Sequence, residues 1–202
     1  MGWDIANGRA APQPETNGID LVAATAGPRR YGFHATMKPP FRLAPGHTEE
    51  GLIAELQALC LAAHPVAIQG MRISAIGRFL ALTPSGEVSA LGKLAGRCVV
   101  ELDHFRDAPE ASELAKRRRA SLSEAQEQML IKWGYPYVLD EFQFHLTLTS
   151  RASKPEIAGL RALAEIHFAA HLAAPTVIDA LTLCGEREDG RFEQIERVDL
   201  SE

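Results

Sequence analysis

Glu141-Phe-Gln-Phe-His-Leu-Thr-Leu-Thr149 shows the clearest alternation of apolar and polar residues in the chain. Successive side chains of a β-strand point to opposite faces, so this period of two predicts a strand with one buried face and one open face. The apolar face carries Phe142, Phe144, Leu146 and Leu148, and the polar face carries Glu141, Gln143, His145, Thr147 and Thr149. A histidine and a threonine, two residues apart, therefore share the open face.

A second His-x-Thr pair occurs in the early stretch Tyr31-Gly-Phe-His-Ala-Thr-Met-Lys38, which is followed by Pro39-Pro40. Proline cannot donate a hydrogen bond to a β-ladder, so the double proline ends the segment. We predict a strand over residues 31–38, with His34, Thr36 and Lys38 on one face.

The segments that follow the two motifs also match in kind. Each motif leads into a stretch with apolar residues at helical spacing, then a proline (Pro65 or Pro175), and then further strands. This repeat indicates an α+β fold with two lobes in a pseudo-twofold arrangement, built from two mainly antiparallel sheets with helices on the outside. The predicted helices cover 48–64, 88–102, 110–119, 123–133 and 153–171, and the predicted strands include 66–74, 78–83, 176–184 and 192–198.

A chain of 202 residues is expected to form a single bilobal domain over residues 1–202. Lobe one covers about 29–104 and lobe two about 134–202, with a helical connection at about 105–133. Residues 1–28 are rich in Gly, Pro, Asn and Ala and form a loop-rich N-terminal segment.

The composition excludes several classes of protein. The chain has 21 Lys and Arg against 26 Asp and Glu, a net charge of −5, so no general attraction to nucleic acid or an anionic membrane is expected. No apolar run approaches the roughly 18 residues of a membrane span, and the start of the chain lacks the apolar stretch of a signal peptide. Three scattered cysteines fit a cytoplasmic protein with reduced thiols. The oligomeric state stays open.

The two motifs together point to phosphate chemistry. If the lobes pair across a pseudo-twofold axis, His34, Thr36, His145 and Thr147 line one cleft. An imidazole titrates near pH 6.5, so one histidine can act as a neutral base and the other as a protonated acid, while the hydroxyls hold phosphate oxygens. We expect neither a metal nor a cofactor, because His167 and His171 lack a third ligand and no glycine-rich phosphate loop is present.

Residues 29–43, 133–138 and 141–149 resemble the two-histidine phosphoesterase superfamily, which includes RNA cyclic phosphodiesterases and 2′-5′ RNA ligase-like enzymes. The strings Arg-Arg-Tyr-Gly-Phe-His-Ala-Thr-Met-Lys-Pro-Pro-Phe-Arg-Leu and Trp-Gly-Tyr-Pro-Tyr-Val look like one branch in particular. That branch is an uncharacterised bacterial family often encoded beside phosphonate-utilisation genes. The resemblance covers nearly all of the chain from Arg29 onward.

The resemblance implies metal-free cleavage of a cyclic phosphodiester, with His34 and His145 as the catalytic pair and Thr36 and Thr147 as phosphate-binding hydroxyls. The phosphonate context implies a small sugar cyclic phosphate as the substrate, and the chain is then a cyclic phosphodiesterase, a phosphoric diester hydrolase. Two features depart from the pattern: Gln143 stands where many relatives carry an arginine, and no apolar strand is expected at the N-terminus.

Five further residues are candidates for contact with the ligand. Lys38 shares the face of His34 and is expected to bind phosphate, unless it is a lysine at the end of a strand in solvent. Arg78, Tyr135, Tyr137 and Gln143 are candidate substrate contacts, although tyrosines beside a proline often only pack.

Two other functions remain open from the sequence. One is a non-catalytic protein that uses the same cleft to sense or bind a phosphorylated metabolite. The other is an RNA end-processing enzyme, either a 2′-5′ ligase or a cyclic phosphodiesterase, which requires a basic, aromatic-lined groove.

Overall fold

The structure is a computed structural model that describes residues 1–16 and 18–201, and it divides into two compact units. The first unit consists of Met1–Ala35, Ala67–Glu87 and His145–Arg197, and the second of Thr36–Val66, Val88–Phe144 and Val198–Glu202. Both α-helices and small antiparallel sheets are present, as the sequence predicts. The lobe boundaries expected from the sequence stay a prediction.

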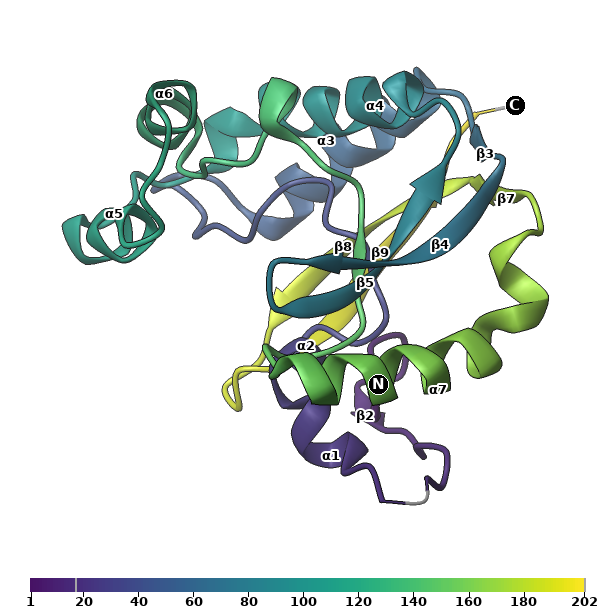
Figure 1. Cartoon of the computed structure of the whole chain (residues 1–202). Helices are drawn as coiled ribbons and strands as arrows, with labels where there is room; N and C mark the ends of the chain where they lie inside the picture. Colours follow the sequence, from purple (N-terminus) through teal and green to yellow (C-terminus); the bar gives the residue numbers. More distant parts are fainter. Residues whose placement is uncertain (17, 202) are drawn as a thin grey trace. The chain divides into compact units, whose positions relative to one another are not determined.

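The order of elements repeats along the chain, which confirms the predicted helix–proline–strand repeat (Figure 1). The first copy runs through α3 (Glu49–Leu61), β3 (Val66–Ile68), β4 (Gly70–Ile76) and β5 (Phe79–Ser85). The second runs through β6 (Leu146–Thr147), α7 (Lys154–Leu172), β7 (Thr176–Ile178), β8 (Ala180–Glu186) and β9 (Phe192–Asp199). The other elements are β1 (Trp3–Asp4), β2 (Arg9–Ala10), α1 (Leu21–Ala24), α2 (Ala26–Arg29), α4 (Ser89–Glu101), η1 (Asp103–Phe105), α5 (Ala111–Arg118), α6 (Glu124–Trp133) and η2 (Leu139–Glu141).

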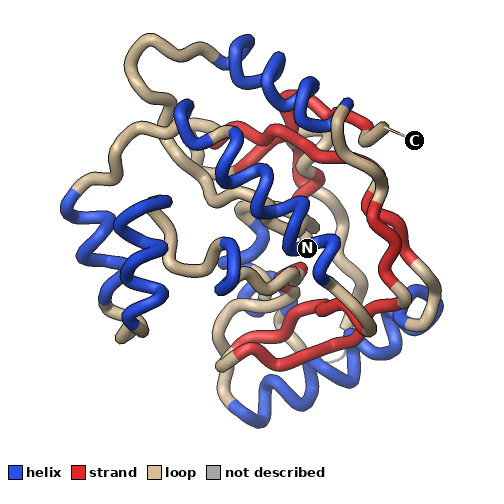
Figure 2. The backbone as a smooth tube through the Cα atoms, turned by 90° about the horizontal axis from the view of Figure 1, so that it is seen from above, coloured by secondary structure: helices blue, strands red, loops and turns tan. Residues whose placement is uncertain are grey.

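The first unit is organised by a three-stranded antiparallel sheet in the order β4-β5-β6. One face of this sheet packs against α7, which lies along the strands (Figures 1 and 2). The core between sheet and helix consists of Ile73, Leu80, Leu82, Leu148 and Leu160. The opposite face of the sheet is therefore available for polar side chains.

The two predicted motif strands are much shorter than expected. Within 31–38 only Ala35 forms a β-bridge, and within 141–149 only Leu146–Thr147 form a strand. After Thr147 the ladder ends in a bulge, because the carbonyl of Leu80 accepts hydrogen bonds from both Leu148 N (2.8 Å) and Thr149 N (3.3 Å). The Thr149 hydroxyl then accepts a hydrogen bond from Leu80 N at 3.0 Å.

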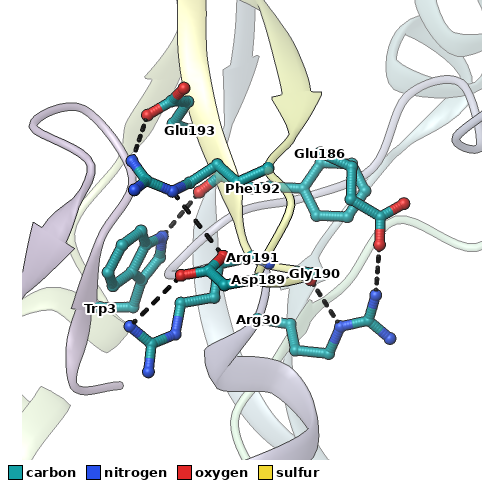
Figure 3. A network of polar contacts seen from close by, with 9 residues as sticks. Trp3, Arg30, Glu186, Asp189, Gly190, Arg191, Phe192 and Glu193 are labelled. Atoms are coloured by element: carbon teal, nitrogen blue, oxygen red, sulfur yellow. Dashed lines mark hydrogen bonds and ion pairs between the residues drawn. The ribbon is translucent and has the colours of Figure 1, made fainter.

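The N-terminal segment forms a short hairpin of β1 and β2 that is hydrogen-bonded to β9, which corrects the expectation that no strand begins the chain. Trp3 in β1 is 5% exposed, and its Nε1 donates to the carbonyl of Phe192 at 2.6 Å. The carbonyl of Ile5 accepts from Gln194 N at 2.8 Å. Figure 3 shows Trp3 beside this part of β9, and also Arg30, which donates to the carbonyl of Gly190 and pairs with Glu186.

The second unit is mainly helical. Its buried side chains come mostly from α3 and α4, with Phe105 and Leu130 contributed by η1 and α6. Cys60 and Cys98 are buried free thiols, and burial raises the pKa of Cys98 to about 12. No described helix is both long enough and apolar enough to cross a membrane.

We expect Trp3→Ala to lower the free energy of unfolding by about 3–5 kcal/mol, because it removes a large buried ring and leaves a cavity. Trp3→Phe should cost less, since it keeps most of the apolar contact, although it loses the hydrogen bond, worth about 1 kcal/mol. Urea unfolding followed by circular dichroism measures both effects. A Trp3→Ala protein as stable as the wild type would contradict the anchoring of this segment.

Candidate functional site

His34 and Ala35 of the first motif lie beside the second motif in the first unit. Ala35 and Leu146 form an isolated antiparallel bridge, and Leu146 also pairs with Leu82 of β5. Leu146 is therefore flanked by two segments that lie far from each other in the chain. Its side chain packs against the apolar core under α7.

The alternation of side chains then decides where the polar groups of β6 lie. Residues next to Leu146 point away from the core, so His145 and Thr147 share the opposite face with Ala81, the partner of Thr147. Continuing the antiparallel bridge at Ala35 places His34 across from Thr147 on this same face. We call this surface, opposite α7 and carrying His34, His145 and Thr147, the polar face.

A stack of aromatic rings holds His34 in place. The His34 ring stacks on Tyr31, with centroids 5.3 Å apart, and Tyr31 stacks on Phe192 at 4.8 Å. The Nδ1 of His34 lies 3.4 Å from the carbonyl oxygen of Gly32 and donates to it in the Nδ1-protonated form. These contacts connect the imidazole to β9 through Tyr31.

Gly32 is required by the backbone of the loop that presents His34. Its φ is +68°, a left-handed conformation that side chains with a Cβ rarely adopt. A Cβ at this position would also lie 3.2 Å from Ile5 Cβ and 3.3 Å from the Trp3 carbonyl oxygen. A larger residue would therefore displace the carbonyl that contacts His34.

Burial lowers the pKa of His34 below its ordinary value. The Gly32 carbonyl raises that pKa, while the positive charge of protonated His145 lowers it. The two imidazoles are thus close enough to repel each other when both carry a proton. At neutral pH this repulsion and the burial favour the neutral form of His34.

His145 extends along the strand toward Phe79. The register aligns Ala81 with Thr147, so Phe79 and His145 lie four residues out of register, or about 13 Å along the strands. Their ring centroids are nevertheless 6.1 Å apart. The two rings must reach toward each other over Ala81, which is fully buried.

Comparison with known proteins identifies the family. Residues 36–193 match the family described as "Protein of unknown function (DUF1045)". The chain belongs to this DUF1045 family. Two curated relatives are both named ribose 1,5-bisphosphate phosphokinase PhnN. The protein from Janthinobacterium sp. (strain Marseille) is 43% identical over 91% of this chain and 42% of its own length. That from Laribacter hongkongensis (strain HLHK9) is 34% identical over 85% and 38%.

These relatives correct the function expected from the motifs. They are named as kinases, so the expected hydrolase activity, a phosphoesterase or cyclic phosphodiesterase, is wrong. The physical reason is that paired imidazoles and hydroxyls bind a phosphate group equally well whether or not a bond to phosphorus is then broken. The DUF1045 chain spans about two fifths of the length of the relatives it matches.

The structure places Lys38 of this DUF1045 protein in an ion-pair network of the second unit. Its Nζ donates to the carbonyl of Val99 at 3.1 Å and lies 3.3 Å from Asp103 Oδ1, and its side chain is 8% exposed. Asp103 is also held by Arg106 Nε at 2.8 Å. These contacts explain the position of Lys38 without a ligand.

The other candidate residues belong to the second unit, except Arg78 in the first. Thr36, Tyr135, Tyr137 and Gln143 belong to the second unit. There the ring of Tyr135 contacts Tyr137, with centroids 5.7 Å apart, and Arg117 lies 4.6 Å from the Tyr135 centroid. Arg78 is exposed just before β5, where its charge acts on Glu156 at the start of α7.

Sequence reasoning missed the aromatic support of His34. The signal was present in Tyr31, an aromatic residue three positions before the histidine, but its partner Phe192 could not be found without the fold.

No group of three metal-ligating side chains occurs in residues 1–16 and 18–201.

The pH titration of His34 tests the proximity of the two imidazoles. We expect NMR to give a His34 pKa below the reference of about 6.5, and His145→Asn to raise it because a repelling charge is removed. The unfolded chain binds a proton near pH 6.5 that the folded His34 resists, so stability should fall as the pH drops through that value. An unchanged His34 pKa in His145→Asn would show that the imidazoles are not coupled.

Proposed function

We propose that the chain binds a phosphorylated ribose metabolite on the polar face, with His34, His145 and Thr147 as the anion-binding groups. The observation that carries the proposal is the Ala35–Leu146 bridge, which brings His34 to the same face as His145 and Thr147. Two imidazoles that repel each other when protonated form a site that an anion stabilises. The Thr147 hydroxyl adds a hydrogen-bond donor from the same face.

Binding and protonation are coupled at this site. Burial favours the neutral form of His34 in the empty protein, since it lowers the pKa. A phosphate beside the imidazoles favours their charged forms and adds charge-assisted hydrogen bonds. Binding of phosphate is therefore accompanied by uptake of a proton, and the affinity for phosphate should increase as the pH falls.

The names of the relatives support a ribose phosphate as the ligand. Both are named for an activity on ribose 1,5-bisphosphate, and both are more than twice as long as the part that this chain matches. The present sequence contains no glycine-rich loop of the P-loop type, the usual cradle for a nucleotide phosphate. We therefore assign binding of the sugar phosphate, rather than phosphoryl transfer, to this chain.

We also propose that the fold is the bilobal two-histidine type, because the order of elements repeats and the two motif segments are bridged. Thr36 follows Ala35 in the chain but falls in the second unit, so the binding proposal rests on the other three motif residues. Phosphonate metabolism remains the expected context.

Isothermal titration calorimetry with ribose 5-phosphate at pH 6.5 tests the binding function. We expect His34→Asn and His145→Asn each to weaken binding about tenfold or more, since a charge-assisted hydrogen bond contributes about 1.5–3 kcal/mol. Thr147→Val should weaken it severalfold. Affinity of the wild type should fall as the pH rises, because His34 then loses the proton that holds the phosphate.

The matched control is His167→Asn, which makes the same change at an exposed position of α7. It should bind ribose 5-phosphate like the wild type, and circular dichroism should show that all variants fold. Equal affinity of the wild type and both motif-histidine variants would reject the polar face as the binding site.

A further inference from the structure

The polar face extends beyond the two histidines onto β4 and β5. The register pairs Thr83 with Arg72 and Ala81 with Ser74, and Ala81 also pairs with Thr147. Directly paired residues lie on the same face of a sheet, and so do residues two apart on one strand. Arg72, Ser74 and Thr83 therefore share the polar face with His145 and Thr147.

We propose that Arg72, Ser74 and Thr83 form a second anion subsite, which makes the polar face selective for a sugar carrying two phosphate groups. This inference rests on the proposed binding function, because the first phosphate is held at the histidines. The second phosphate binds across β4 and β5.

The hydroxyls of Ser74 and Thr83 form a donor pair within the subsite. Their oxygens lie 2.6 Å apart, a hydrogen bond in which either hydroxyl can donate. One proton is used within the pair, and the other hydroxyl proton remains to be donated outward to an acceptor such as a phosphate oxygen. Both residues are half-buried, which orders the pair before a ligand arrives.

Arg72 supplies the charge of the subsite. It lies on β4, the edge strand of the three-stranded sheet, and is exposed. Within the described part of the chain its guanidinium has neither a hydrogen bond nor an ion pair, whereas Arg30, Arg161 and Arg187 of the same unit each contact a carboxylate. A planar guanidinium with five donors is well suited to a phosphate.

The spacing separates this subsite from the histidines. Arg72 and His145 lie on opposite sides of Thr83, so two strand spacings, about 9–10 Å, separate their backbones. The His145 ring also extends toward Phe79, away from the paired residues Arg72 and Thr83. The guanidinium and the imidazole are therefore offset along the polar face, so that two phosphates on one sugar can occupy the two ends.

The test compares two ligands, ribose 5-phosphate and ribose 1,5-bisphosphate, by titration calorimetry on folded variants of the full chain. The wild type should bind the bisphosphate at least tenfold more tightly. Arg72→Gln should remove this preference while leaving the affinity for ribose 5-phosphate within about twofold of the wild type. Thr83→Val should reduce the preference severalfold, and Arg151→Gln, the same charge change at an exposed loop position, should keep it.

The possible outcomes distinguish failure of the subsite from failure of the proposed binding function. A wild type without preference, or an Arg72→Gln protein that keeps the preference or loses both affinities equally, overturns the subsite. If His145→Asn weakens both ligands in the same experiment, the binding function stands regardless of that result. If His145→Asn leaves both affinities unchanged while Arg72→Gln abolishes the preference, the first phosphate is not at the histidines and the binding function fails.

Discussion

The pairing of Leu146 on both sides is the constraint on which the rest of the first unit depends. Leu146 pairs with Leu82 of β5 on one side and with Ala35 of the first motif on the other. Its side chain packs against the core under α7. A strand with one residue fixed inward must turn its neighbours outward. A slip by one residue would bury the imidazole of His145 in that core and expose a leucine. The apolar packing therefore enforces the position of the polar groups.

The alternation in 141–149 was sufficient to predict which side chains share a face, but not how long the strand is. The bulge at Leu80 depends on hydrogen bonds to a segment more than sixty residues away, which no local pattern contains. The left-handed Gly32 similarly reduces the strand predicted over 31–38 to a single bridge. The placement of Lys38 assumed regular alternation after Thr36, and the chain bends at Met37 and Lys38 instead.

Register is the information that the sequence lacks most. Arg72 and Thr83 stand in segments correctly predicted as strands, yet their place beside His145 follows only from which strands pair and at which residues.

The sequence motif also leaves the reaction undetermined. Two His-x-Thr pairs predict a group that recognises phosphate, but the same donors serve a binding protein and a hydrolase, so the reaction cannot be deduced from the motif.

If the polar face binds phosphate as proposed, the burial of His34 helps the site to distinguish an anion from a neutral ligand. Its lowered pKa favours the neutral imidazole in the empty site, which weakens the long-range attraction of His34 for anions in general. In that proposal, a phosphate that enters favours the protonated imidazole and is held by charge-assisted hydrogen bonds in partly desolvated surroundings. A neutral sugar cannot drive this protonation. Because the stack from Phe192 through Tyr31 holds the ring in its half-buried place, the packing of the N-terminal segment on β9 supports the selectivity of the site.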